Sequence, residues 1–295
     1  MEEIFRRRTM KKGSYIFRRT ISCLLCIAML LSFGITAFAD NESQRRGNQS
    51  YYSNQGDLQE DAFTTLPLGA VQPKEWLKEQ LLLQKEGLLG NMQDNYPIYS
   101  SSNGWRGGNG DTWEKGPYYL RGLTQTAFIL NDKDLKEKAM TWIDWILNNQ
   151  RDNGFIGPLK DGDGTSKNWD WWPRMVVLLT LQDYYEATEQ LGDPDARVLP
   201  FLEKYFRYQL AHIDQWPLTQ YWDEARGGDN IEVVLWLYNR LYDASNPNAS
   251  QWLIDLANKL YSSTYAHPAT LQRRYRPLSD AARAGAGRDL FCGAA

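Results

Sequence analysis

Three acidic residues stand at the starts of predicted helices, each in or beside a loop rich in Trp, Gly or Arg. They are Glu114, Asp170 and Asp229. A single acid in such a position commonly caps the helix or interacts with its dipole, which contributes about 0.5–2 kcal/mol. Glycoside hydrolysis, in contrast, needs two carboxyl groups, one protonated as an acid and one ionised as a base or nucleophile. Because three loops share the pattern, we predict these residues as catalytic candidates.

Arginine and tryptophan surround these acids. An arginine can pair with a carboxylate or fix an acid in place. A tryptophan beside carboxylates suits a carbohydrate, because its flat ring covers the C–H face of a sugar and its N–H needs a partner. The alternative is that these rings fill gaps between helices. The candidate substrate-binding residues are Trp105, Arg106, Asp111, Trp113, Tyr118, Trp169, Trp171, Trp172, Arg174, Arg226 and Asn230.

Other chemistries have weaker signals. The chain has only two histidines and three cysteines, and it contains no HExxH motif and no phosphate-binding loop. His212 ends a predicted helix, where a capping cation is typical. The run from Asp161 to Gly164 resembles a fragment of a calcium loop but lacks the remaining ligands, so we interpret it as a turn. We therefore predict no metal site from these residues.

The acids belong to a unit that occurs three times, with a period of about 60 residues. Each unit has an entry loop, an apolar helix, an Asp-containing turn and an amphipathic helix. Such a repeat predicts stacked helical hairpins, which usually carry their function on the loops of one face. The entry loops are expected over residues 105–117, 169–173 and 226–230.

The two kinds of helix predict the architecture. The second helix of each unit is amphipathic, over residues 135–150, 195–210 and 250–262, and another helix over residues 73–89 precedes the array. The first helices are apolar almost all round, as in MVVLLTLQDYY and IEVVLWLYNRLY, which indicates burial on all sides. We therefore predict an all-α fold, an (α/α) toroid of the six-hairpin barrel type. Its buried helices form the inner ring, and the three entry loops surround one end of its axis.

Residues 1–39 have the features of a secretory signal. Seven basic residues precede an apolar run from Ile21 to Ala39, and Ala37-Phe38-Ala39 fits the cleavage pattern. An uncleaved membrane anchor is the alternative, since the run is long enough to span a bilayer. We expect cleavage near Ala39, no membrane span afterwards, and a secreted or cell-surface protein. Residues 40–65 are polar and are predicted to be a flexible tether.

Charge and cysteine usage limit the partners. Removing residues 1–39 leaves 26 basic and 34 acidic residues, a net charge of about −8, which argues against a nucleic-acid partner. Only Cys292 remains, so no internal disulfide can form and a large core must hold the fold. The expected partner is a carbohydrate.

Several long motifs resemble a known family. WRGGNGDTWEKGPYYLRGL, DWWPRMVVL and ARGGDNIEVVLWLYN are similar to glycoside hydrolase family 127, which includes bacterial β-L-arabinofuranosidases. The resemblance covers residues 66–265. It implies an (α/α)6 catalytic barrel, usually followed by β-sandwich domains, and activity on plant-type arabinofuranosides. The characterised enzymes use a cysteine nucleophile in a zinc site, and zinc is therefore expected in full-length relatives. Residues 66–265 contain no cysteine, so no nucleophile, metal ligand or cofactor is assigned to this chain.

The last segment, residues 266–295, is rich in Arg, Ala and Gly, unlike the rest of the chain. It is interpreted as a frameshifted or chimeric end, with a natural tail as the alternative. A toroid incomplete at this end would expose apolar surface and favour self-association. The leading hypothesis is an exported, truncated glycoside hydrolase. The alternatives are a polysaccharide lyase or uronide hydrolase of similar fold, and a non-catalytic carbohydrate-binding or inactive fragment.

Overall fold

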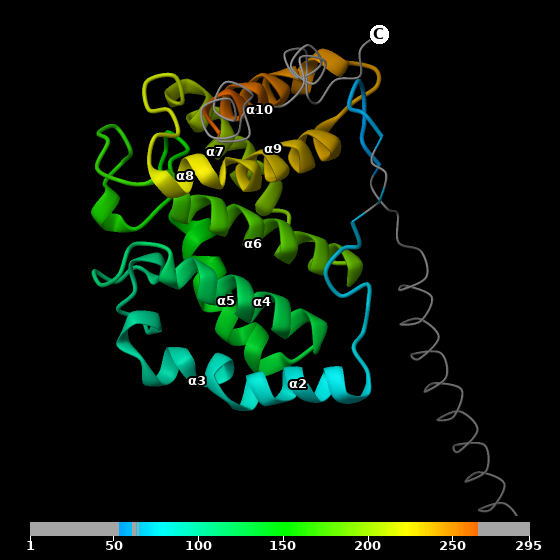
Figure 1. The fold of residues 1–295 in the computed structure, drawn as a ribbon, viewed down its shortest axis with the longest axis vertical. Helices are drawn as coiled ribbons and strands as arrows, with labels where there is room; N and C mark the ends of the chain where they lie inside the picture. The colour runs from blue at the N-terminus through cyan, green and yellow to red at the C-terminus, as the bar shows by residue number, and fades with distance from the viewer. Residues whose placement is uncertain (1–52, 61–62, 64, 265–295) are drawn as a thin grey trace, which may run out of the picture. The chain divides into compact units, whose positions relative to one another are not determined.

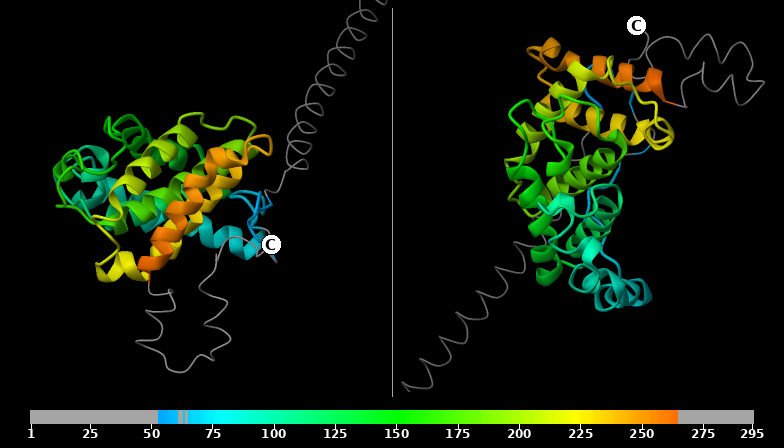
Figure 2. Two further views of the ribbon diagram at one scale, coloured as in Figure 1. Left: turned by 90° about the horizontal axis from the view of Figure 1, so that it is seen from above. Right: turned by 90° about the vertical axis from the view of Figure 1, so that its left-hand side faces the viewer.

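The computed structural model describes residues 53–60, 63 and 65–264. The predicted signal and the atypical tail lie outside these residues. The described part of the chain consists of α-helices, short 3₁₀ turns and loops, without a β-strand, and Figure 2 shows this from two further directions. The all-α prediction is confirmed. Within the same residues, no helix combines the length and apolar character that crossing a bilayer requires.

Three helical hairpins build two layers, as predicted. They are α4 (Lys115–Ile129) with α5 (Lys133–Asn148), α6 (Trp171–Gln190) with α7 (Val198–His212), and α9 (Gly227–Leu241) with α10 (Gln251–Ser263). The inner helices lie side by side, because α4 packs against α6 and α6 packs against α9 (Figure 1). The outer helices α5, α7 and α10 cover them. This arrangement agrees with the predicted (α/α) class.

The opening helix is divided in two. The pattern predicts one helix over residues 73–89, but the structure has α2 (Glu75–Glu86) and α3 (Leu88–Asn95), with Gly87 between them. Gly87 has a backbone conformation outside the helical region, and its N–H bonds to the Leu83 carbonyl. None of the α2 side chains is buried, and Trp76 is 69% exposed.

The inner helices differ in how they are buried. Every residue from Trp171 to Gln182 of α6 is buried, as its apolar sequence predicts. The expectation of burial on all sides is wrong for α9, which keeps one polar side, and α4 does the same. Residues spaced three or four apart share a helix face. The accessible faces of α4, α6 and α9 therefore carry a polar strip, made of Tyr118, Arg121, Gln125, Asp183, Glu186, Asp229 and Glu232.

The entry to the array includes elements that the pattern did not predict. A short helix, α8 (Tyr221–Ala225), precedes α9, and 3₁₀ turns occur at Gly104–Arg106 (η2) and Leu159–Asp161 (η3). Because α4 begins at Lys115, α6 at Trp171 and α9 at Gly227, parts of all three predicted entry loops are first turns of helices.

Part of the predicted tether packs onto the array. The Gln55 N–H donates to Oδ1 of Asn239 at 2.9 Å, and Nδ2 of Asn239 donates to Oδ1 of Asn54 at the same distance. Leu58 is buried in the core. The segment around Asn54 therefore belongs with the helical array, through its contacts with α9.

Candidate functional site

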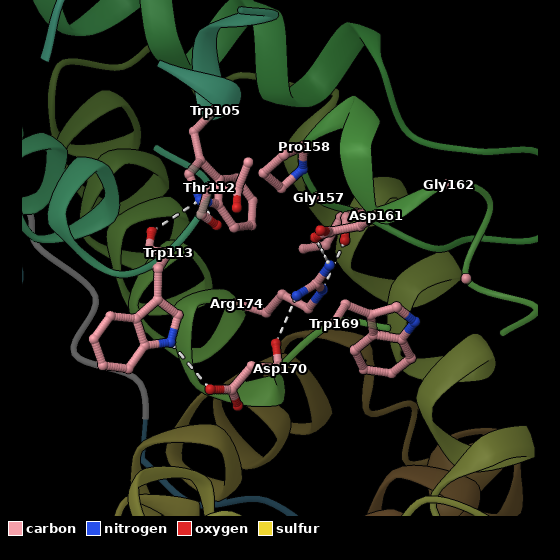
Figure 3. A network of polar contacts seen from close by, with 12 residues as sticks. Trp105, Thr112, Trp113, Gly157, Pro158, Asp161, Gly162, Trp169, Asp170 and Arg174 are labelled. Atoms are coloured by element: carbon pink, nitrogen blue, oxygen red, sulfur yellow. Dashed lines mark hydrogen bonds and ion pairs between the residues drawn. The ribbon is translucent and has the colours of Figure 1, made fainter. Parts of the chain in front are cut away.

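Two indole–carboxylate hydrogen bonds join the first two entry loops. Nε1 of Trp113 donates to Oδ2 of Asp170 at 3.0 Å, and Nε1 of Trp172 donates to Oε2 of Glu114. Oδ1 of Asp170 also accepts from the Trp172 N–H at 3.0 Å, so the capping role considered for Asp170 is observed as well. Figure 3 shows Trp113 reaching Asp170 from the neighbouring loop. The two acids are held by N–H donors, which suit an ionised carboxylate.

Residues from α4 and the start of α9 complete this rim. Tyr118 is 45% exposed, and the edge of its ring lies against Trp172, with ring centroids 5.8 Å apart. The Arg226 guanidinium lies 5.8 Å from the Trp172 ring centroid. Burial raises the pKa of Tyr118, and Arg226, Glu114 and Asp229 also act on it electrostatically. We call this group the rim; it consists of Trp113, Glu114, Tyr118, Asp170, Trp172, Arg226 and Asp229.

Asp229 differs from the other two acids of the rim. Burial raises the pKa of its carboxyl, and the nearby cations Arg226 and Arg121 oppose that change. A carboxyl group whose pKa is raised by burial is suited to carry a proton. The rim therefore combines carboxylates held by donors with one carboxyl that favours protonation.

Arg174 fixes the second entry loop from inside the protein. Its side chain is 1% exposed and donates to the Ile156 carbonyl at 2.8 Å, the Asp170 carbonyl at 2.6 Å and Oδ2 of Asp161 at 2.5 Å. Figure 3 shows it at the centre of this network. Gly157 is required beside it, because a Cβ there would lie 2.3 Å from the guanidinium. Of the two roles predicted for this arginine, fixing the acids fits the structure and direct substrate contact does not.

Other predicted binding residues also lie in the interior. Trp105 donates to the carbonyls of Thr112 and Trp113 at 3.1 and 3.2 Å, and Trp171 donates to the Trp216 carbonyl at 2.8 Å. Such side chains cannot contact a substrate without rearrangement, so they fit the alternative of filling gaps. The fully or almost fully buried residues of the predicted set are Trp105, Trp169, Trp171, Trp172, Arg174 and Asn230.

Arg106, Asp111 and Asn230 make contacts with residues outside the rim. The Arg106 guanidinium lies 5.3 Å from the centroid of a core tryptophan ring, and Asn230 exchanges two hydrogen bonds with Gln209 of α7. Asp111 is half-buried, and its backbone carbonyl accepts from Gly104 at 2.8 Å. Asn230 therefore ties the third hairpin to the second, Arg106 packs against α5 of its own hairpin, and Asp111 shapes the first loop.

The polar strip is a feature that the sequence prediction missed. Nε of Arg121 lies 3.2 Å from Oδ2 of Asp183, which also accepts from Nε2 of Gln125 at 2.8 Å. Burial raises the pKa values of Asp183 and Glu232, and Arg121 opposes both changes. The Glu232 side chain is exposed, but the surrounding helices displace enough water from its carboxyl group to raise the pKa. The available signal was the presence of charged residues inside apolar runs, such as Asp183 in LLTLQDYY.

Asp223 on α8 was also missed. Its side chain is fully buried, burial and the nearby Asp170 raise its pKa to about 7, and Lys167 opposes that rise. Burial in turn lowers the pKa of Lys167 to about 8. The signal that could have found it is an acid in the aromatic run QYWDEA, directly before the third loop.

The described residues do not provide the zinc site that the family resemblance implies. Among them, no three His, Cys, Asp or Glu side chains are grouped so that they could bind a metal. His212 ends α7 as predicted, and its ring is stacked between Tyr208 and Trp216 at centroid distances of 4.2 and 5.0 Å. All three cysteines lie outside the described residues. No catalytic step is therefore derived through a metal.

The comparisons with known proteins agree with this architecture. The family profile for the β-L-arabinofuranosidase GH127 catalytic domain matches residues 54–286, well over half of the chain. No curated protein and no solved structure matches the chain. The match extends beyond the resemblance over residues 66–265 at both ends, and its start agrees with the packing of Asn54 on α9. The chain belongs to the GH127 family of β-L-arabinofuranosidase catalytic domains.

Proposed function

We propose that this protein is an exported glycoside hydrolase that acts on plant-type oligo- or polysaccharides with β-L-arabinofuranosyl groups. The observation that carries the proposal is the rim, where two indoles from adjacent hairpins donate to Glu114 and Asp170, and where Glu114 and Asp229 both act electrostatically on Tyr118. Trp113, 39% exposed, and Tyr118 offer flat apolar faces beside these acids. Family membership supports the same reaction class.

The three acids divide into two roles. Asp229 is the candidate acid, because burial favours its protonated form. Glu114 and Asp170 are the candidate ionised groups, because N–H donors stabilise a carboxylate. Arg226, which is exposed at the rim, is the candidate for binding a substrate oxygen.

The test is hydrolysis of aryl β-L-arabinofuranoside and of arabino-oligosaccharides by the secreted protein. We expect turnover by the wild type, and a loss of at least about 10²-fold in kcat for Glu114→Gln and Asp229→Asn, which is the contribution of a positioned acid or base. The control is Asp193→Asn, an exposed acid in the turn after α6, which should retain full activity. Unchanged kcat in both rim variants would contradict the assignment.

A lyase or uronide hydrolase is the second candidate, because Arg226 at the rim and Arg121 in the polar strip could bind an acidic sugar. A lyase releases an unsaturated product that absorbs in the ultraviolet, whereas a hydrolase of neutral arabinosides does not. If neither product forms, isothermal titration with the same oligosaccharides tests the remaining alternative, a non-catalytic binding role.

A further inference from the structure

Two aromatic side chains on the short helix α8 are exposed to solvent. Tyr221 is 58% exposed and Trp222 is 43% exposed. Their ring centroids lie 4.8 Å apart, and the two rings are nearly perpendicular, at 81°. The phenol ring therefore packs against the indole and restrains it. We call this pair the α8 platform.

Trp222 differs from the tryptophans of the first two entry loops in its indole N–H. The indoles of Trp105, Trp113, Trp171 and Trp172 each donate to a carbonyl or a carboxylate. In the part of the chain that the structure describes, no residue accepts the N–H of Trp222. An exposed indole with an available N–H can cover an apolar face of a ligand and also donate to a hydroxyl group.

The size of the α8 platform fits a small ligand. A tyrosine or tryptophan side chain buries about 150–250 Å² when it is fully covered, so the exposed parts of these two amount to roughly 200 Å². A stable protein interface needs about 800 Å² on each partner. The neighbouring residues Thr219, Gln220 and Arg226 are exposed and polar, so the apolar surface does not extend further on these sides. A sugar ring, with apolar C–H faces and hydroxyl groups at its edge, matches such a surface.

The α8 platform lies one helical turn before the rim. The Arg226 N–H donates to the Trp222 carbonyl at 2.9 Å, and the Asp229 N–H donates to the Arg226 carbonyl at 2.9 Å. Residues three or four positions apart are neighbours on a helix surface, with about 5–6 Å between their Cβ atoms. Trp222, Arg226 and Asp229 therefore follow one another in single-turn steps. The Arg226 guanidinium in turn lies 5.8 Å from the centroid of the Trp172 ring.

The surface next to these residues is open. Ala225 and Arg226 are exposed, and a Cβ added at Gly228 would have no heavy atom within 4 Å. Figure 1 shows α8 at the end of the array where α6 begins, and α8 packs against both α6 and α9. A ligand bound at the rim can therefore continue toward α8 without displacing a side chain at Gly228.

We propose that Tyr221 and Trp222 form a sugar-binding subsite for neutral arabino-oligosaccharides. In this subsite the Trp222 ring stacks on a sugar residue next to the one held at the rim, and Tyr221 keeps the indole in place. The inference rests on the proposed function and specifies its substrate, because a subsite beside the rim favours a chain of sugars over a single glycoside. The α8 platform binds and takes no part in bond cleavage.

Isothermal titration of the full-length protein with a short β-L-arabino-oligosaccharide tests the subsite without catalysis. We expect Trp222→Ala to weaken binding by about tenfold, as the truncation of an aromatic anchor does. Trp222→Phe keeps a flat ring and should retain most of the affinity. The control is Trp76→Ala, which removes an exposed tryptophan of α2 and should bind like the wild type. Equal affinity of the wild type and Trp222→Ala would overturn the proposal, and so would an equal loss in both Trp222 variants.

Oxidative footprinting of the wild type provides a test that does not depend on the folding of any variant. Hydroxyl radicals oxidise exposed aromatic rings, and mass spectrometry of the peptides locates the modified residues. We expect saturating oligosaccharide to protect Trp222 and to leave Trp76 as reactive as before. Methyl β-L-arabinofuranoside at the same concentration, with a single sugar residue, should protect Trp222 less. Oxidation of Trp222 that is unchanged by the oligosaccharide would overturn the proposal.

The outcomes separate this subsite from the proposed function. Hydrolysis of arabino-oligosaccharides with an unprotected Trp222 would leave the proposed function standing and remove the subsite. Protection and tenfold weaker binding in Trp222→Ala, without any hydrolysis by the wild type, would support the subsite and contradict the proposed reaction. Absence of both binding and hydrolysis would overturn both.

Discussion

Arg174 connects the loop before α6 to the helix itself. Its three hydrogen bonds reach a backbone carbonyl on each side and the Asp161 carboxylate. Aromatic rings surround it, with the centroids of Phe155 and Trp169 at 4.6 and 4.8 Å from the guanidinium carbon. A buried cation in such a site is fully compensated only while all of these partners are present. Its removal therefore affects Asp161 and the position of Asp170 together.

We expect Arg174→Met to destabilise the protein by about 3–5 kcal/mol, because Asp161 is left as a nearly buried charge without its partner. Urea denaturation measures the free energy of unfolding. The control is Lys160→Met, an exposed cation in the same loop, which should change it by less than about 0.5 kcal/mol. Equal effects of the two substitutions would show that the network around Arg174 contributes little.

The positions of the three acids could be predicted from the sequence, whereas the burial of the loop tryptophans could not. Glu114, Asp170 and Asp229 could be placed together because each starts a helix of the same repeated unit. Their catalytic role stays a prediction. Trp105 and Trp169 resemble Trp113 in sequence, since all three follow Gly, Asn or Thr in loops, yet only Trp113 is exposed. The difference lies in how the loops fold back over Arg174, and local composition does not encode that contact.

Among the elements, the helix pairs follow closely from the period of apolar residues. The predicted outer helices 135–150, 195–210 and 250–262 become Lys133–Asn148, Val198–His212 and Gln251–Ser263. The polar strip on α4, α6 and α9 could not be predicted in the same way, because a helix in an inner layer has neighbours on several sides. Which of its faces remains open depends on the other helices and not on its own period.

The turn between α4 and α5 illustrates how one residue joins three elements. Asp132 caps α5 by accepting from the Leu135 N–H at 3.0 Å, and it pairs with Lys85 of α2. Burial alone would raise the pKa of Asp132, but Lys85 and the Leu135 N–H outweigh it and lower the pKa. The ionised form therefore stabilises the fold.

We expect Asp132→Ala to lower the free energy of unfolding at neutral pH by about 1 kcal/mol or more, from the lost cap and ion pair. Because the folded-state pKa is depressed, this difference should be present above about pH 4 and should shrink as the pH falls below it. Thermal unfolding across that range is the measurement. Asp134→Ala, which removes an exposed acid two residues further along the chain, is the control. A difference that does not depend on pH would argue against an ionised Asp132.

At the scale of the whole molecule, the segment around Asn54 marks where the helical array begins. The family match starts at residue 54, and Asn54 and Gln55 bond to α9. This leaves residues 40–53 as the remaining length of the predicted tether. The export signal before it is a prediction about residues 1–39, which lie outside the described residues.

We expect the mature protein to begin at Asp40, because Ala37 and Ala39 supply the small residues that a signal peptidase requires. Amino-terminal sequencing of the secreted protein measures this. Ala39→Arg should block cleavage and retain the unprocessed chain with the cells, whereas Ser43→Arg, beyond the site, should have no such effect. A wild-type protein that keeps residues 1–39 and stays in the membrane fraction would support the anchor alternative.

The two indole–carboxylate bonds of the rim have a consequence for how this protein can change over evolutionary time. Each hairpin supplies an acid to the other hairpin and receives one in return, across 57 and 58 positions of sequence. Neither loop therefore satisfies its own hydrogen bonds. A substitution in one loop leaves an indole N–H or a carboxylate of the other loop without that partner. Substitutions in the two loops are therefore expected to be inherited together, although the codons of the two loops lie far apart in the gene.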